Sequence, residues 1–130
     1  MSKWVIVALM CSGLIAACTS TGSGVSGSKP LLDLNNAEIA DLCEYFVDLF
    51  GPARTVDCGG GLTITVGGGS VAECIEDVQD SQDTALNCTA DVFDAEFCAE
   101  DLADIPDEEL CDDGPLPSSC TVLIQCGDIL

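Results

Sequence analysis

Residues 35–52, NNAEIADLCEYFVDLFGP, carry the clearest structural signature in this sequence. The apolar residues in this stretch recur with the 3.6-residue period of an α-helix and gather on one side of a helical wheel. They are Ile39, Leu42, Cys43, Phe46, Val47, Leu49 and Phe50. Asn35 followed by Glu38 is typical of a capped helix start, and Gly51 with Pro52 is typical of a helix end. We therefore expect an amphipathic helix with Cys43 in its buried stripe.

The residues that follow predict further short elements. In residues 55–66, TVDCGGGLTITV, apolar residues alternate with threonines after a glycine run, which predicts a β-hairpin. Residues 70–80 predict a second helix, because Ser70 and Glu73 have the spacing of a capping box. Residues 89–103 predict a third helix, and residues 118–126 favour a last short helix over a strand. The expected fold class is mostly α: a small disulfide-stapled helical domain of three to four short helices with one β-hairpin.

The first 17 residues have the pattern of an export signal. Lys3 is followed by an uncharged, mainly apolar run over residues 4–17 that ends in small residues. This run has 14 residues, whereas a membrane-spanning helix needs roughly 20. A transmembrane anchor is therefore the less favoured alternative.

The four residues Ile15, Ala16, Ala17 and Cys18 resemble the lipobox of bacterial lipoproteins, in which an aliphatic residue and two small residues precede a cysteine. The resemblance implies that the Cys18 sulfur receives a diacylglyceryl group, that residues 1–17 are then removed, and that Cys18 becomes the acylated N-terminus. It also implies the outer membrane, since Thr19 differs from the Asp that retains many lipoproteins in the inner membrane. Beyond Cys18, the chain is similar in composition to small, acidic, cysteine-rich envelope lipoproteins.

Composition divides the remainder of the chain into a tether and a domain. Residues 19–30, TSTGSGVSGSKP, are rich in Gly, Ser and Thr, and as a random coil they would reach about 18–20 Å on average. The sequence thus predicts a signal peptide at 1–17, a lipidated Cys18 with a flexible linker over 18–30, and an acidic, disulfide-rich helical domain over 31–130. One hundred residues suffice for one domain.

Eight cysteines within 31–130 are the candidates for disulfide bonds. They are Cys43, Cys58, Cys74, Cys88, Cys98, Cys111, Cys120 and Cys126. An even number in a small exported domain is typical of a disulfide framework, with 105 connectivities open. Zinc is the alternative, but structural zinc sites use cysteine pairs two to four positions apart, and none here are closer than six.

Spacing argues against two of the direct pairings. Bridged Cα atoms lie within about 7 Å of each other. Cys120 and Cys126 would be about 9 Å apart in a helix and about 20 Å apart in an extended chain. Cys88 and Cys98 are separated further. We therefore expect the disulfides to join elements that are distant in the sequence.

The charge of the chain limits its partners. From Cys18 onward, 23 carboxylates face two cations, Lys29 and Arg54, which gives a formal charge of −21. Such a surface repels nucleic acid and anionic head groups. A solubilising role is the first interpretation. The second is a binding site for divalent cations or a basic partner, with residues 100–113 and their eight carboxylates as the best location, although no calcium-loop motif is present.

The sequence lacks the common motifs of enzyme active sites. The chain contains no His, which excludes Ser-His-Asp and Cys-His arrangements, and it has no C-x-x-C motif. The glycine runs lack the Lys and Ser/Thr of a phosphate-binding loop. We therefore expect that the chain is not an enzyme and holds no cofactor or metal. We expect an envelope lipoprotein whose domain is structural or binds an envelope protein. The alternative is a carboxylate-rich binder of divalent cations or a basic protein. Oligomeric state stays open.

Overall fold

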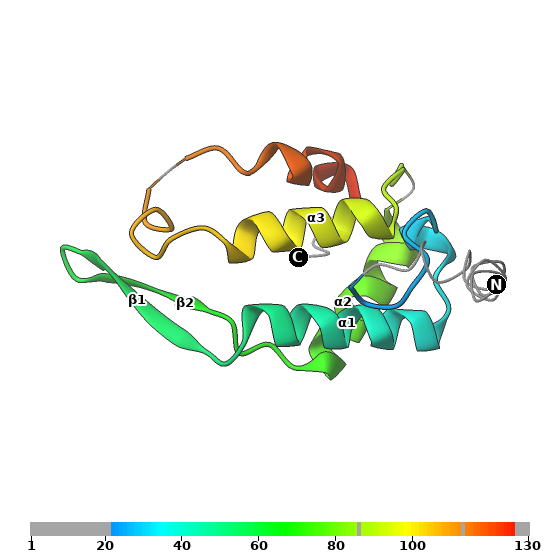
Figure 1. The fold of residues 1–130 in the computed structure, drawn as a ribbon, viewed down its shortest axis with the longest axis horizontal. Coiled ribbons are helices and arrows are strands. Elements are labelled where there is room, and N and C mark those ends of the chain that lie inside the picture. Colours follow the sequence, from blue (N-terminus) through cyan, green and yellow to red (C-terminus); the bar gives the residue numbers. More distant parts are fainter. Residues whose placement is uncertain (1–21, 86, 113, 127–130) are drawn as a thin grey trace, which may run out of the picture.

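The computed structural model describes residues 22–85, 87–112 and 114–126 (Figure 1). The elements are, in chain order, η2 (Leu31–Asp33), α1 (Asn36–Phe50), β1 (Arg54–Gly59), β2 (Leu62–Val66), α2 (Val71–Thr84), α3 (Val92–Ala103) and η3 (Ser118–Cys126). In Figure 1, α1 and α3 lie alongside each other, and the β1–β2 hairpin extends from one end of the helical part. The expected mostly α domain with one hairpin is confirmed.

Helix α1 begins and ends where its sequence predicts. The Asn35 side chain accepts hydrogen bonds from the N–H groups of Ala37 (2.9 Å) and Glu38 (3.1 Å). The Glu38 carboxylate in turn accepts the Asn35 N–H (2.9 Å), which completes a capping box. The fully or nearly buried side chains of this helix are Ile39, Leu42, Cys43 and Phe46. The predicted apolar stripe is therefore the face that packs in the core.

The hairpin forms between the predicted segments. Strands β1 and β2 pair antiparallel, with Val56 opposite Ile64 and an irregular register between Asp57 and Gly59. The Asp57 carboxylate accepts the Gly59 N–H (2.8 Å) at this irregularity. The turn glycines adopt positive φ angles, so the glycine run serves the turn as predicted.

Helix α2 starts at the predicted capping box but extends four residues further than predicted. Ser70 accepts the Glu73 N–H (3.2 Å) and the Glu73 carboxylate accepts the Ser70 N–H (3.0 Å). The C-terminal extension to Thr84 is held by polar contacts. The Gln82 side-chain amide donates to the carbonyl oxygens of Leu31 (2.9 Å) and Leu34 (3.2 Å). Because these partners are distant in sequence, helical periodicity did not predict them.

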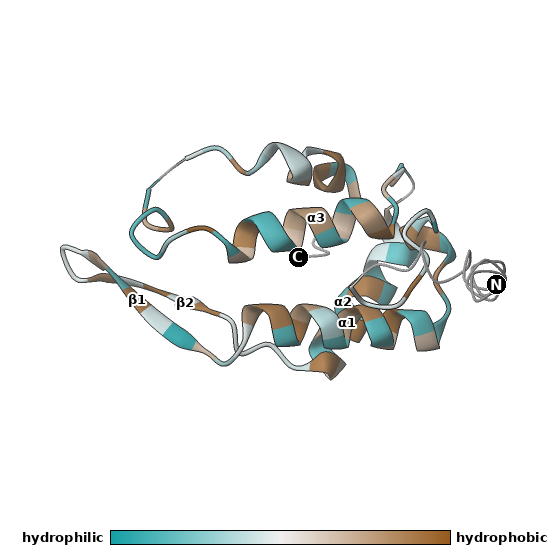
Figure 2. Cartoon of the chain, viewed as in Figure 1, coloured by the Kyte–Doolittle hydropathy of each residue, from teal (hydrophilic) through white to brown (hydrophobic). Residues whose placement is uncertain are grey.

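Helix α3 turns a face of small residues toward the core. Ala95, Cys98 and Ala99 are completely buried, and helix α3 packs against α1 and η3. Figure 2 shows hydrophobic residues recurring along α1 and α3 with hydrophilic residues between them. Small side chains permit close approach of the helices. The larger Phe93 and Phe97 consequently lie on another side of α3, where they are 41% and 56% exposed.

The segment 22–30 differs from the flexible linker that its composition predicts, because it packs on the domain. The Leu31 N–H donates to the Ala90 carbonyl (3.0 Å), the Val92 N–H to that of Lys29 (3.1 Å) and the Phe93 N–H to that of Gly27 (2.9 Å). Val25 is 4% exposed and belongs to the hydrophobic core. The domain therefore begins no later than Gly22, and the free tether predicted over 18–30 is wrong for residues 22–30.

Candidate functional site

The predicted lipid attachment site, Cys18, lies outside the described residues, as does the predicted signal peptide 1–17. The description begins at Gly22, four positions after Cys18. None of the helices in the described ranges is long and apolar enough to span a membrane.

All eight cysteines of the domain form disulfide bonds with one another, as predicted. The pairs are Cys43–Cys74, Cys58–Cys111, Cys88–Cys126 and Cys98–Cys120, with Cα–Cα distances of 5.7, 5.2, 4.5 and 4.6 Å. The bonds that spacing disfavours, between Cys88 and Cys98 and between Cys120 and Cys126, are not formed. The described cysteines are therefore all oxidised, and they leave no thiolate for catalysis or metal binding.

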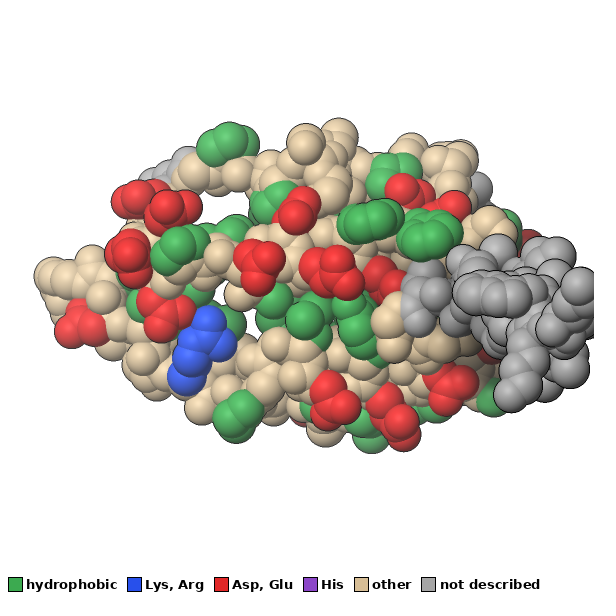
Figure 3. Space-filling model, in the orientation of Figure 1, with side chains coloured by type: hydrophobic (Ala, Val, Ile, Leu, Met, Phe, Trp, Pro, Cys, Tyr) green, Lys and Arg blue, Asp and Glu red, His purple; other side chains and the backbone are tan. Residues whose placement is uncertain are grey.

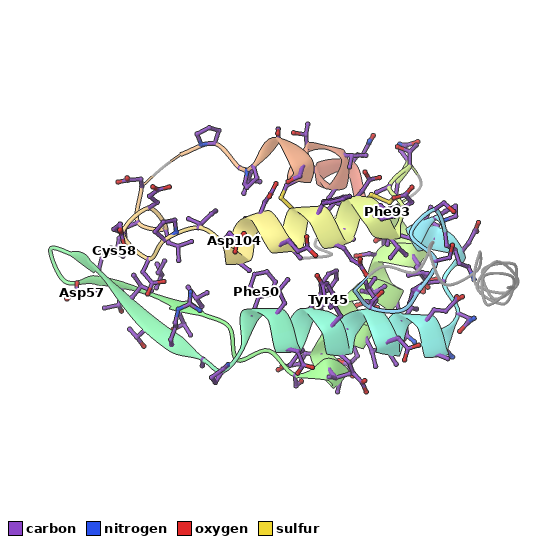
Figure 4. The ribbon with its side chains drawn as sticks, viewed as in Figure 1. Tyr45, Phe50, Asp57, Cys58, Phe93 and Asp104 are labelled. Atoms are coloured by element: carbon purple, nitrogen blue, oxygen red, sulfur yellow. A yellow bond between two sulfur atoms is a disulfide. The ribbon has the colours of Figure 1, made fainter. Side chains whose placement is uncertain are left out.

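Each disulfide joins two different elements. Cys43–Cys74 links α1 to α2, and Cys98–Cys120 links α3 to η3. Cys58–Cys111 links the hairpin to the loop that follows α3, at the end of the molecule where Figure 4 labels Cys58. This bond holds together two segments outside the hydrophobic core, where Cys58 and Cys111 are half-buried.

An aromatic patch, defined here as Phe93 and Phe97, is exposed on α3. The two rings stack with their centroids 5.8 Å apart and their planes inclined by 17°. Together with Gly22, Glu96 and Glu100 they line a pocket of about 150 Å³. Figure 4 places Phe93 toward the N-terminal end of α3, and Figure 3 shows hydrophobic side chains over this helix among carboxylates. Large exposed aromatic side chains next to each other are typical of an interaction surface.

Four carboxylates surround the aromatic patch on α3, and each of them accepts a hydrogen bond from the protein. The buried Glu96 carboxylate accepts the N–H groups of Gly22 (3.2 Å) and Ser23 (2.9 Å). Glu100 accepts the Tyr45 hydroxyl (2.6 Å), Asp94 the Asp91 N–H (3.0 Å) and Asp101 the Ser119 hydroxyl (2.5 Å). Glu96 thus fixes the beginning of the described chain beside the aromatic patch.

Three of the described surface groups titrate away from their ordinary values. Partial burial raises the pKa of the Tyr45 hydroxyl well above its usual range, and the hydrogen bond to the Glu100 carboxylate raises it further. The Lys29 ammonium, 2.6 Å from the Glu38 carboxylate, lowers the pKa of Glu38, and the Asn35 N–H adds to this effect. Hydrogen bonds from the side chain and backbone of Ser70 lower the pKa of Glu73.

Of the acidic stretch predicted as a cation or basic-protein site, residues 100–113, the described residues 100–112 form the end of α3 and the following loop. Its exposed carboxylates include Asp104, Asp107 and Glu108. Arg54 from the hairpin donates to the Asp107 carboxylate (3.0 Å). Within the described ranges, the structure brings together no group of three or more His, Cys, Asp or Glu side chains that could hold a metal ion.

A second pocket, of about 360 Å³, lies between the end of α1 and the start of α2. Phe46 and Phe50 line its apolar side, and Gly67 to Gly69 form part of its wall. Glu73 and Asp77 also line it. These carboxylates make the pocket unsuitable for a phosphate group.

The aromatic patch and its link to the N-terminal segment are not apparent from the sequence pattern. Phe93 and Phe97 lie four positions apart on one side of α3, away from Ala95 and Ala99 on a helical wheel. Glu96 and Gly22 are 74 positions apart, so no local pattern connects them. Comparison of the chain with protein-family models, curated proteins and solved structures found no match.

Proposed function

We propose that this chain is an exported envelope lipoprotein, held in the outer membrane of a bacterium by lipid on Cys18. Its domain acts as a non-enzymatic structural or protein-interaction module. The supporting observation is that the eight cysteines after Cys18 all pair with one another. Disulfides persist in oxidising compartments such as the periplasm. Export to such a compartment agrees with the signal-like residues 1–17 and with the resemblance of residues 15–18 to a lipobox.

The experiment is intact mass spectrometry of the protein extracted from membranes, before and after reduction. We expect a chain that begins at Cys18 and carries added acyl mass. Reduction should add the mass of eight hydrogens, two for each of the four bonds. The matched variant is Cys18→Ser, with Cys11→Ser as the control, because Cys11 lies within the apolar run. Equal acylation and membrane partitioning of Cys18→Ser and the unaltered protein would contradict the proposal.

A second candidate function is binding of a basic protein, and the exposed carboxylates of residues 100–112 favour it. Only Lys29 and Arg54 supply positive charge in the described ranges, and each already pairs with a carboxylate. The remaining negative potential would attract a basic partner over a distance set by the Debye length, about 10 Å at 0.1 M salt. Such binding should weaken steeply between low and moderate ionic strength. Affinity that is unchanged over this range would exclude an electrostatic partner.

A further inference from the structure

We propose that the aromatic patch lies against the same bilayer that holds Cys18, with the Phe93 and Phe97 rings in the zwitterionic head-group region. This inference rests on the proposed lipid attachment at Cys18. It goes beyond attachment, because it specifies which face of the domain contacts the membrane and how the domain is oriented on it.

The first support is the route of the N-terminal segment. The buried Glu96 carboxylate holds the N–H groups of Gly22 and Ser23, and the Phe93 N–H donates to the Gly27 carbonyl. Gly27 passes directly beneath the Phe93 ring, since a Cβ on Gly27 would lie 2.3 Å from a ring carbon. Gly22 itself lines the same pocket as both rings. The described chain therefore begins beside the aromatic patch.

The second support is the short reach of the chain between Gly22 and the lipid. Cys18 is four residues before Gly22, and an extended chain spans at most 3.3–3.6 Å per residue, or about 14 Å in total. The head-group region is about 5–8 Å thick on each side of a bilayer. Acylated Cys18 lies at this region, so the aromatic patch must stay close to the membrane surface. The hairpin extends from the opposite end of the molecule in Figure 1.

The third support is the chemistry of the patch. Stacked, exposed Phe rings gain free energy when apolar surface leaves water, and the lipid anchor makes this contact intramolecular, so that a small area suffices. The surrounding carboxylates Asp94, Glu96, Glu100 and Asp101 accept hydrogen bonds within the protein. Their charges repel anionic lipids, which is why the expected surface is zwitterionic, as in phosphatidylethanolamine.

The test uses tryptophan as a reporter in the lipidated protein. Trp4 is the only tryptophan in the sequence, and it is removed with residues 1–17 under the proposed processing. Phe97→Trp reports on the patch. Leu62→Trp is its matched control at the hairpin, because Phe97 and Leu62 are 56% and 60% exposed. Both proteins are placed in phosphatidylethanolamine and phosphatidylcholine vesicles, with and without brominated acyl chains, after their acylation has been checked by mass.

We expect the tryptophan emission of the Phe97→Trp protein in vesicles to lie at shorter wavelength than that of the Leu62→Trp protein. Brominated lipid should quench it several-fold more than it quenches the emission of the Leu62→Trp protein, and the difference should shrink when anionic lipid is added. Acylated proteins in which both reporters are quenched equally weakly would overturn the membrane orientation alone. A wavelength shift of the Phe97→Trp emission without quenching, together with dimers in sedimentation, would show that the patch contacts a second copy of the chain. That result would also overturn the membrane orientation. An unacylated chain that keeps Trp4 would overturn the proposed attachment itself.

Discussion

Gly67 lies where the end of the hairpin passes the end of α1, and a side chain there would collide with the backbone unless the two segments moved apart. Its φ angle is +74°, and a Cβ would lie 2.7 Å from the Gly51 carbonyl oxygen and 2.8 Å from that of Phe50. The neighbouring Gly68 N–H donates to the Gly51 carbonyl (2.9 Å). The close approach of the two backbones at Gly67 depends on tertiary packing that the sequence pattern does not contain.

Gly67→Ala should therefore destabilise the domain more than Gly61→Ala. At Gly61 the φ angle is also positive (+85°), but nothing lies within 4 Å of an added Cβ, so only backbone strain of about 1–2 kcal/mol is expected. At Gly67 a steric cost of about 1–3 kcal/mol is added. Denaturant unfolding of the two variants measures the difference. Equal free energies of unfolding would show that the backbones at Gly67 can separate without cost.

Glu38 gives the stability a defined dependence on pH. Its pKa in the folded protein is lowered from 4.5 by Lys29 and Asn35. A lowered folded pKa means a contribution that is present above the unfolded value and is lost as the pH falls through the folded pKa. Glu38→Gln should thus melt at lower temperature than the unaltered protein at neutral pH, and this difference should shrink below about pH 4.5. A difference that is the same at both pH values would contradict the assigned role of the charge.

At the scale of the elements, local signals predicted most of the secondary structure. The capping boxes at Asn35 and Ser70 and the alternation in residues 62–66 correspond to the observed starts of α1 and α2 and to β2. The predictions fail where the structure of a segment depends on contacts with residues that are distant in the sequence. The end of α2 depends on Gln82 binding carbonyls of residues 31 and 34, and the segment 22–30 depends on Val25 entering a core built by other elements.

The buried Val25 provides a test of whether residues 22–30 belong to the domain. Val25→Ala should lower the melting temperature, because Val25 is 4% exposed and full burial of such a side chain contributes about 1.5–3 kcal/mol, of which the variant loses part. Ser28→Ala, at an exposed position in the same segment, is the control and should change little. A flexible linker would instead give two variants with the same melting temperature as the unaltered protein.

At the scale of the whole molecule, the sequence predicted that the eight cysteines pair, but it did not predict with which partners. The even number of cysteines and the expected oxidising compartment suffice to predict that they pair. Which cysteine pairs with which depends on how α1, α2, α3 and η3 pack. The same holds for the aromatic patch, which becomes a surface only because small residues of α3 face the core. The predicted Cys18 site is independent of packing, and it stays a prediction.

Two disulfides allow the effects of chain entropy and burial to be compared. Cys58–Cys111 spans 53 positions and Cys98–Cys120 spans 22, which in a chain-entropy account corresponds to about 4 and about 3 kcal/mol. However, Cys98 and Cys120 are 0% and 3% exposed. We expect the double variant Cys98→Ala/Cys120→Ala to lose more stability than Cys58→Ala/Cys111→Ala, because it also leaves a cavity in the core. Denaturant unfolding measures the free energy of unfolding of the two double variants. A larger loss in Cys58→Ala/Cys111→Ala would mean that the length of the closed loop matters more than burial.

The connectivity also has a consequence for biogenesis. Each of the four bonds passes over at least one other cysteine in the sequence; Cys43–Cys74, for example, passes over Cys58. A polypeptide oxidised residue by residue while it emerges from a translocation pore would join consecutive thiols and acquire none of the native links. If the chain is exported as proposed, correct oxidation has to wait until Cys126 has emerged, or wrong bonds have to be exchanged by a thiol–disulfide isomerase. In a cell that lacks such an isomerase, we expect the chain to accumulate in scrambled forms.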